Sequence, residues 1–416
     1  MKSFRWPIAF LVLPFFMPYS SAQTLDAWLP TSAQVAPALQ ASPLIQSARS
    51  KMESQLQRAR GIEAGSGEWA VRLNQQQRRV RDQQERFAET IVAVERPVRL
   101  WGKAGMDGRI SEQDRELARL RLADALHEAS RQLLIHWFAA LRARADSDSA
   151  EIELHLAREL DRQARVRLRQ GEISQLDARL AEAELQRSEA AVLMVQAERL
   201  RSFTQLQRLY PGLPDLRWPI SGAQLPGLPG ESMETALQDF LNRNHELNLV
   251  RAEARRQQQL AERIERDRLP DPSLGIFTAR ERAGGEQLAG VSLAIPLAGV
   301  YRESQARAAL ADSEALAQRV LQLERELSAQ FEARWLLLIE QQQALIALRS
   351  ASATQRIAAE KSLIAYSMGE HSMTELIHNR RLAIERQLAA QRLLIEVAHN
   401  RAQIELDAHR LWDLDD

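Results

Sequence analysis

The chain has 416 residues, of which 26% are charged, 5% are aromatic and none is cysteine. Without cysteine the sequence excludes disulfides, thiolate zinc sites and a cysteine nucleophile, and its 55 basic and 55 acidic residues cancel, so no basic field indicates a nucleic-acid partner. The dominance of Ala, Leu, Arg, Glu and Gln is typical of long packed helices.

The N-terminus, MKSFRWPIAFLVLPFFMPYSSAQ, has the pattern of a secretory signal peptide. Positive Lys2 and Arg5 precede an apolar run, and small residues precede a cleavage site between Ala22 and Gln23. A membrane anchor is disfavoured because two prolines interrupt a run shorter than the roughly 20 residues that a span needs. We therefore expect residues 1–22 to be removed, leaving a chain that is soluble outside the cytoplasm or crosses a membrane as β-strands.

Residues 23–210 form a first predicted unit of helix, two strands and a long helical hairpin. In EWAVRL, Trp69, Val71 and Leu73 fall on one face with the period of two that indicates a strand. The expected elements are a helix over about residues 42–62, strands over about 68–80 and 86–97, and a helical hairpin over about 111–209 with its tip at 171–174.

A connector over residues 211–230 is rich in proline and glycine, which excludes helix and central strand. Residues 231–416 then repeat the same order, with Val291, Leu293 and Ile295 in period-two alternation. The expected elements are a helix over about residues 232–268, strands over about 272–280 and 287–297, and a helical hairpin over about 303–414 with its tip at 369–372.

Two landmarks indicate that the second unit is a duplicate of the first. Pro97 and Pro296 end the second strand of each unit and lie 199 positions apart. Gly171 and Gly369 each open a turn of pattern GExSxx(D/E) and lie 198 positions apart. Nearly equal offsets favour an internal duplication of about 200 residues.

Both glycine turns carry the residues that reverse a helical hairpin. Glycine permits the backbone reversal, and a serine three positions before an acidic residue predicts a capping box on the returning helix. The residues are Gly171, Ser174 and Asp177 in the first turn and Gly369, Ser372 and Glu375 in the second.

One chain can neither pair all of its predicted strand edges nor bury the apolar faces of its long helices. Two hairpins give four strands with two bare edges, and unpaired backbone groups cost several kcal/mol each in lipid. The apolar stripes of the long helices likewise have no globular core to enter. Both requirements are met if several chains share one closed sheet above a cylinder of helices.

Four short stretches carry a resemblance to a known family: YSMGEHSMTEL (366–376), VSLAIPL (291–297) and the helix openings PLIQSAR and ELNLVRAEA. In these stretches the sequence resembles the TolC-type outer membrane efflux proteins of Gram-negative bacteria. The resemblance spans essentially the whole mature chain. RPVRLWGK and LDARLAEAELQRSEAAVL lean toward the heavy-metal, CzcC-like branch of that family.

The resemblance implies a mainly α fold with a small β part. A homotrimer would form a twelve-stranded β-barrel in outer membrane lipid, continued by a periplasmic α-helical barrel. It would be the exit duct of a tripartite efflux pump or type I secretion system, and its tips would dock a periplasmic adaptor beneath an inner-membrane pump. The alternative is a soluble periplasmic coiled-coil adaptor or structural protein.

The resemblance also implies a gate at the second tip. Glu375 keeps an acid where the family rings its pore, and Tyr366 matches the family's lock tyrosine. His378 stands where a second acid is common, and His371 stands where an arginine helps to lock the pore. We expect Glu375 from three chains to favour cations, with His371 and His378 making closure sensitive to pH at about 6–7. The alternative is that both histidines are solvated and gate nothing.

An enzyme, a cofactor and a metal site are not expected. GxSxG, HExxH, phosphate-loop and Cys/His patterns are missing from the sequence. His127, His136 and His155 share one predicted helix at spacings of 9 and 19, not the spacing of four that pairs metal ligands. His399 and His409 are likewise too far apart.

Overall fold

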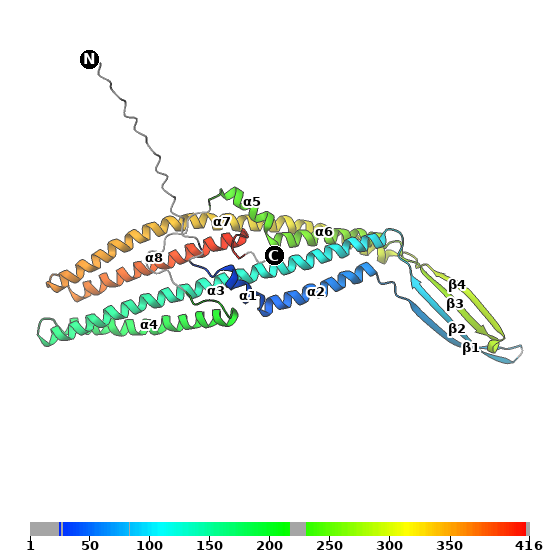
Figure 1. Ribbon diagram of the computed structural model, residues 1–416, viewed down its shortest axis with the longest axis horizontal. Coiled ribbons are helices and arrows are strands. Elements are labelled where there is room, and N and C mark those ends of the chain that lie inside the picture. Colours follow the sequence, from blue (N-terminus) through cyan, green and yellow to red (C-terminus); the bar gives the residue numbers. More distant parts are fainter. Residues whose placement is uncertain (1–24, 26–27, 83, 217–229, 413–416) are drawn as a thin grey trace, which may run out of the picture.

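The computed structural model describes residue 25 and residues 28–82, 84–216 and 230–412. The molecule is elongated: long helices run side by side along it, a β-sheet lies at one end and the tips of two helical hairpins lie at the other (Figure 1). The expected signal peptide lies outside the described residues, and so does most of the expected connector.

Two helices dominate the length. α3 has 67 residues and α7 has 68, so at 1.5 Å per residue each is about 100 Å long. None of the helices in the described ranges combines the length and apolar character required to cross a bilayer. The helices are α1 (Ser32–Gln40), α2 (Pro43–Ala64), α3 (Lys103–Arg169), α4 (Gln175–Leu209), α5 (Met233–Arg243), α6 (His245–Arg266), α7 (Val300–Ser367) and α8 (Met373–Asp407).

Three helix boundaries differ from the sequence prediction. α3 begins at Lys103 instead of about residue 111. The helix expected over 232–268 is two helices, because Asn244 ends α5 and its side chain accepts a hydrogen bond of 2.8 Å from the backbone N–H of Leu247 to cap α6. α8 ends at Asp407, not near 414.

The four strands form one antiparallel sheet in the order β1-β2-β3-β4. They are β1 (Ala70–Val80), β2 (Glu85–Pro97), β3 (Ser273–Glu281) and β4 (Glu286–Ala294). The central pair, β2 with β3, joins the two halves of the chain, with Val94 opposite Ile276. β4 ends before Pro296, which has no N–H to donate to a ladder.

The two faces of the sheet differ in character, because paired residues share a face and successive residues alternate, and one face is the more apolar near the helices. On the apolar face Leu73 pairs with Val92 and Ile276 pairs with Val291. Of these, Leu73, Ile276 and Val291 are 67%, 64% and 84% exposed. This face is therefore uncovered in the single chain.

The opposite face carries charge pairs alongside the apolar residues Ile91, Phe277 and Leu288. Arg72 lies 2.6 Å from Glu95, and Arg78 lies 2.8 Å from Glu89 and 3.1 Å from Glu281. These pairs cross from β1 to β2 and on to β3, so they pair side chains of both halves of the chain on one face of the sheet.

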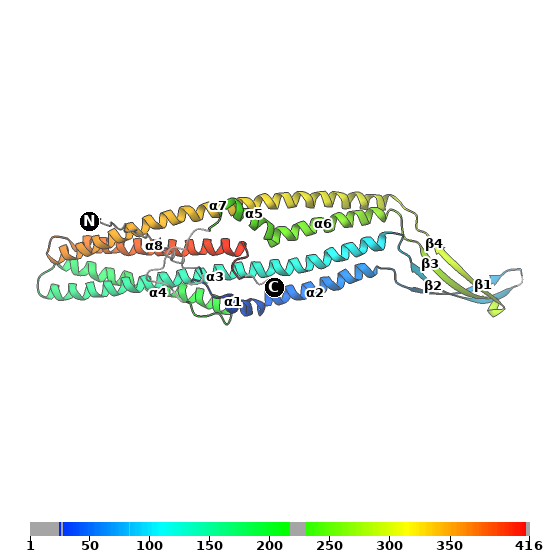
Figure 2. The ribbon, with the colours of Figure 1, turned by 45° about the horizontal axis from the view of Figure 1, so that its top comes forward.

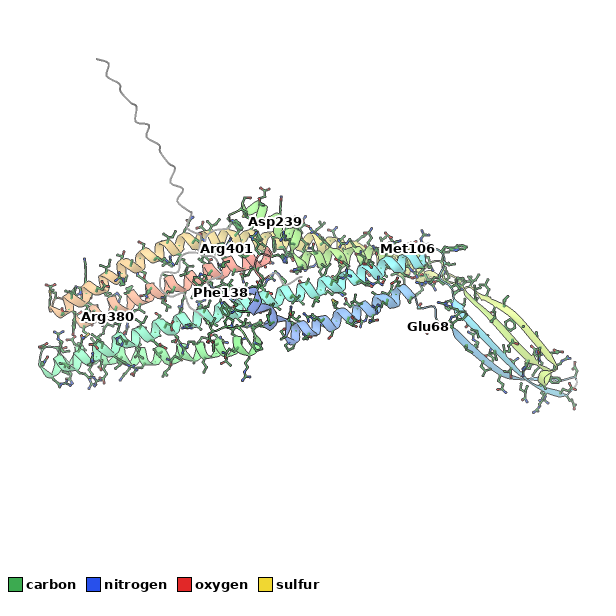
Figure 3. All side chains as sticks on the ribbon, in the orientation of Figure 1. Glu68, Met106, Phe138, Asp239, Arg380 and Arg401 are labelled. Atoms are coloured by element: carbon green, nitrogen blue, oxygen red, sulfur yellow. The ribbon has the colours of Figure 1, made fainter. Side chains whose placement is uncertain are left out.

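The largest core lies at mid-length, where α1, α3, α5, α7 and α8 meet. Phe138 and Arg401 mark this region in Figure 3. The indole Nε1 of Trp137 donates to the backbone oxygen of Trp28, and that of Trp412 donates to Pro30, each at 2.8 Å. These bonds attach the two ends of the described chain to the core.

The predicted fold class is confirmed as mainly helical with a four-stranded antiparallel sheet and a repeated helix–hairpin architecture. Its trimeric assembly stays a prediction.

Candidate functional site at the hairpin tips

Both hairpins reverse through the same backbone motif. Gly171 has φ of 75° and Gly369 has φ of 79°, the left-handed region that glycine enters without steric cost. The N–H of Gly369 donates to Tyr366 at 3.1 Å and that of Glu370 donates to Ala365 at 2.9 Å, and the turn at Gly171 has the equivalent pair. These are Schellman motifs, which satisfy the last carbonyls of α3 and α7.

Capping boxes begin both returning helices. The Ser372 hydroxyl accepts a hydrogen bond of 3.2 Å from the N–H of Glu375, whose carboxylate accepts one of 2.8 Å from the N–H of Ser372. Ser174 and Asp177 make the same exchange at 3.1 and 3.3 Å. The shared GExSxx(D/E) pattern thus encodes two turns of one geometry.

The carboxylate of Glu375 is exposed, and its cap keeps it charged. The hydrogen bond from the backbone of Ser372 lowers the pKa of Glu375 below its ordinary value, and the Ser372 hydroxyl lowers it further. A negative charge therefore lies on the surface of the second tip, at the N-terminal end of α8, where the helix dipole favours it.

The two tips of one chain pack against each other. Leu160 and Ala164 of α3, Ala181 of α4, and Met373 and Leu376 of α8 form a buried cluster. Figure 2 shows both hairpins ending side by side at this end of the molecule. The tips are therefore one surface built from both repeats.

Tyr366 connects the second tip to the first. The guanidinium of Arg167 on α3 lies over its ring, 5.1 Å from the centroid, a cation–π contact. Burial raises the pKa of Tyr366, and its hydroxyl is inaccessible to solvent with no hydrogen-bond partner among the described residues. The resemblance implied an arginine at position 371, which is histidine in this chain. The arginine that contacts Tyr366 is instead Arg167 of the first hairpin.

The two tip histidines are both exposed. Nδ1 of His371 lies 3.3 Å from the hydroxyl of Ser362 on α7. His378 lies one turn beyond Glu375 on α8.

An ion network behind the tips was missed by the sequence prediction. The Glu184 side chain on α4 is 8% exposed and lies 2.9 Å from Arg187 on its own helix. Nε of Arg381 on α8 donates to the same carboxylate at 2.9 Å. Burial raises the pKa of Glu184, but the bonds from Arg381 and Arg187 outweigh burial and leave it lowered. The Glu184–Arg187 spacing was visible in the sequence, but the partner 197 positions away was not.

A second missed feature lies away from the tips. His127, His245 and His409 come from three segments far apart in the sequence, and a ring nitrogen of each lies within 4.8 Å of the others. The sequence argument against a metal site considered only histidines at short spacing on one helix. It could not detect histidines from distant segments that the fold brings together.

Two searches of sequences found no relative: no family model matches the chain, and no curated protein matches it. Solved structures do match. The outer membrane channel CmeC of Campylobacter jejuni is similar over 99% of this chain and 94% of its own, with a TM-score of 0.74 and 13% identity. The outer membrane channel OprN gives a TM-score of 0.76 at 17% identity, covering 95% of each chain. CusC gives 0.71 at 15% identity, covering 91% of each.

At these identities the matches establish a shared fold. They do not separate the heavy-metal branch from the others.

Proposed function

We propose that this chain is the outer membrane channel of a tripartite efflux pump, a homotrimeric duct that passes substrates from the periplasm to the outside of a Gram-negative cell. The fold that it shares with CmeC, OprN and CusC supports this proposal. The duct catalyses no reaction and needs no cofactor, because an inner-membrane transporter selects and drives the substrate.

The observation that carries the proposal is the two-faced sheet. Its apolar face is uncovered, its other face holds charge pairs, and β1 and β4 have no outer neighbour within the described chain. Strands of 9 to 13 residues match the roughly 9–11 that cross a bilayer at a tilt. Apolar residues outside and polar residues inside are the pattern of a closed sheet in lipid.

The helices offer a matching pair of edges. α4 and α7 lie on opposite sides of the helical layer (Figures 1 and 2). Met194 on α4 is 75% exposed, and Ile346 on α7 is 61% exposed. If β1 of one chain pairs with β4 of the next, and α4 of one chain packs against α7 of the next, both contacts are head-to-tail. Head-to-tail contacts close into a ring when the rotation between neighbouring chains permits. Three copies supply twelve strands.

The tips would form the inner mouth and the adaptor-docking surface. In the proposed gate, Glu375 from three chains presents charged carboxylates that favour cations, and Tyr366 with Arg167 holds each second hairpin against the first. In the same proposal His371 and His378, both exposed at this tip, make closure sensitive to pH. The simpler alternative is that the tip histidines are solvated and do not gate.

Cysteine cross-linking tests the ring. The chain contains no cysteine, so Leu73→Cys on β1 and Val291→Cys on β4 would be the only thiols. With a flexible thiol cross-linker, the double variant should give covalent dimers and trimers, and nothing larger. Each single variant should give monomers only, because a ring never places two β1 or two β4 edges together.

The rival assignment, a soluble periplasmic adaptor or structural coiled coil, predicts a different outcome. The double variant would then stay monomeric, and the native chain would fractionate with the soluble periplasm. A detergent-extracted trimer that dissociates on heating supports the duct.

Conductance of reconstituted trimers tests the gate separately. Glu375→Ala should reduce cation selectivity, and His378→Ala should flatten the response to pH. If both variants keep the native selectivity and pH response, the gate proposal fails while the duct stands.

A further inference from the structure

Three imidazoles converge at mid-length, far from the tips. The ring centroids of His245 and His409 lie 4.5 Å apart, those of His127 and His409 lie 5.4 Å apart, and those of His127 and His245 lie 5.5 Å apart. A ring nitrogen of each falls within 4.8 Å of the other two. All three residues are half-buried.

The fold builds this cluster from both halves of the chain. His127 lies on α3 of the first half, and His245 is the first residue of α6, directly after the cap residue Asn244. His409 follows the end of α8. The break that splits the expected helix into α5 and α6 is thus the feature that places His245.

His409 has a backbone conformation that glycine would adopt more easily. Its φ is 56°, and its N–H donates to Leu406 at 3.0 Å while that of Arg410 donates to Glu405 at 2.9 Å. This is the Schellman motif that ends α3 and α7, where the same position is Gly171 or Gly369. Glycine would therefore suit the backbone at position 409 at least as well as histidine does.

A carboxylate supports the cluster. Oδ1 of Asp407, whose side chain is 5% exposed, lies 3.3 Å from Nε2 of His127. A carboxylate beside one ring nitrogen orients the imidazole, and the guanidinium of Arg131 lies 3.2 Å from the same nitrogen. Arg131 and Arg334 also bind Asp407, so the carboxylate is held in place from two further helical positions.

We propose that His127, His245 and His409 bind one divalent transition-metal ion of the class that imidazole favours, such as Zn²⁺, Ni²⁺ or Cu²⁺. Around a tetrahedral Zn²⁺ with bonds of about 2.0–2.1 Å the ligand nitrogens lie roughly 3.3 Å apart. The three nitrogens here lie within 4.8 Å of one another, so the rings would have to move closer together to take up this geometry around an ion. Water or a substrate group completes the fourth position.

Such an ion would fasten the end of α8 to α3 and to the start of α6. Three segments far apart in the sequence would share one set of bonds, so the metal would stabilise the mid-length core in the folded chain. This inference stands apart from the proposed duct, because it concerns the ligands within one chain.

The test uses the full chain, purified in detergent without a polyhistidine tag and stripped of metal with a chelator. Zn²⁺ titrated calorimetrically should bind at one ion per chain with a micromolar or lower Kd, and Co²⁺ should give the visible absorption of a nitrogen-rich tetrahedral site. Zn²⁺ should also raise the Tm, since a ligand of the folded state stabilises it.

His409→Gly is the decisive variant. Glycine suits the left-handed turn, so the metal-free variant should keep or exceed the native Tm, while its Zn²⁺ affinity falls about tenfold or more. His127→Ala should lose binding similarly. The double variant His371→Ala/His378→Ala, which removes the exposed tip histidines, should bind as the native chain does.

No saturable binding near one ion per chain, or native affinity in His409→Gly, overturns the proposal. So does loss of binding in the tip variant alone.

Discussion

At position 369 the backbone has φ of 79°, a conformation that costs a residue with a Cβ about 1–2 kcal/mol. No atom within 4 Å would contact an added methyl group, so the cost is conformational and not a clash. Gly369→Ala should therefore lower the free energy of unfolding by about 1–2 kcal/mol, measured by urea denaturation in detergent.

Gly61 is the matched control for this substitution. It lies within α2, also with no atom within 4 Å of an added Cβ. Gly61→Ala should raise the free energy of unfolding by about 0.5–1 kcal/mol, because alanine favours a helix interior. Equal effects of the two substitutions would contradict the role assigned to the turn.

The cap at Glu375 predicts a pH dependence of stability. Because the hydrogen bonds from Ser372 lower the pKa of Glu375 from 4.5 in the folded chain, its contribution is complete above about pH 4.5 and is lost as pH falls through the lower, folded value. Glu375→Gln should therefore lower the Tm at pH 7, and the difference from the native chain should shrink in acid.

Ser372→Ala separates the cap from a general effect of charge. It removes the hydroxyl that accepts from Glu375 N–H and donates to the carboxylate at 2.9 Å, and it should cost about 1 kcal/mol. A Tm difference for Glu375→Gln that stays constant from pH 7 to pH 3 would exclude the cap as the source.

Where the strands meet the helices, a buried lysine joins the two halves. The Lys103 side chain is 2% exposed, and its Nζ donates to the carbonyl of Leu269 at 2.6 Å and lies 2.9 and 2.8 Å from Asp267 and Asp271. Lys103 begins α3, whereas its partners lie between α6 and β3. The network therefore fixes the sheet relative to the helices.

Lys103→Met should lower the free energy of unfolding by about 1–3 kcal/mol, because it removes the donor that Asp271 and the carbonyl of Leu269 share. Lys51→Met, at an exposed position of α2, should change it by less than about 0.5 kcal/mol. Asp271→Asn in the Lys103→Met background should restore part of the loss. A Lys103→Met chain as stable as the native one would show that the network contributes little.

The same junction shows why the sequence predicted some elements better than others. The start of α4 depends on a local capping box, which is readable from neighbouring residues. The start of α3 was expected near residue 111, yet α3 begins at Lys103, and Lys103 and Asp107 are buried in ion pairs with residues beyond position 260. Tertiary contacts of this kind outweigh propensity.

Across the whole molecule, the residues that meet from distant segments were the ones that the sequence could not predict. The tip residues follow from the repeated turn, since every contact in a capping box spans three positions. His245 and His409 lie 164 positions apart, and Arg381 meets Glu184 across 197. Only the duplicated topology, with helices of both halves side by side, brings such pairs together.

The direction in which the sheet faces can be tested by one pair of substitutions. Leu73 and Asn74 are neighbours on β1, with Leu73 on the apolar face and Asn74 on the polar one. If lipid covers the apolar face, Leu73→Arg should cost about 2–4 kcal/mol near the bilayer midplane and less near its edges. The amount of the proposed trimer recovered from the outer membrane fraction should fall accordingly. Asn74→Arg would face the lumen, so it should assemble normally and alter single-channel conductance.

Equal recovery of the two variants, with neither affecting conductance, would mean that no bilayer distinguishes the faces. The exposed apolar side chains would then require another cover, and the duct would lose its main support. A deficit confined to Leu73→Arg would instead assign lipid to one face and water to the other. A closed sheet around a pore requires that division of its two faces, because only its outer surface meets hydrocarbon.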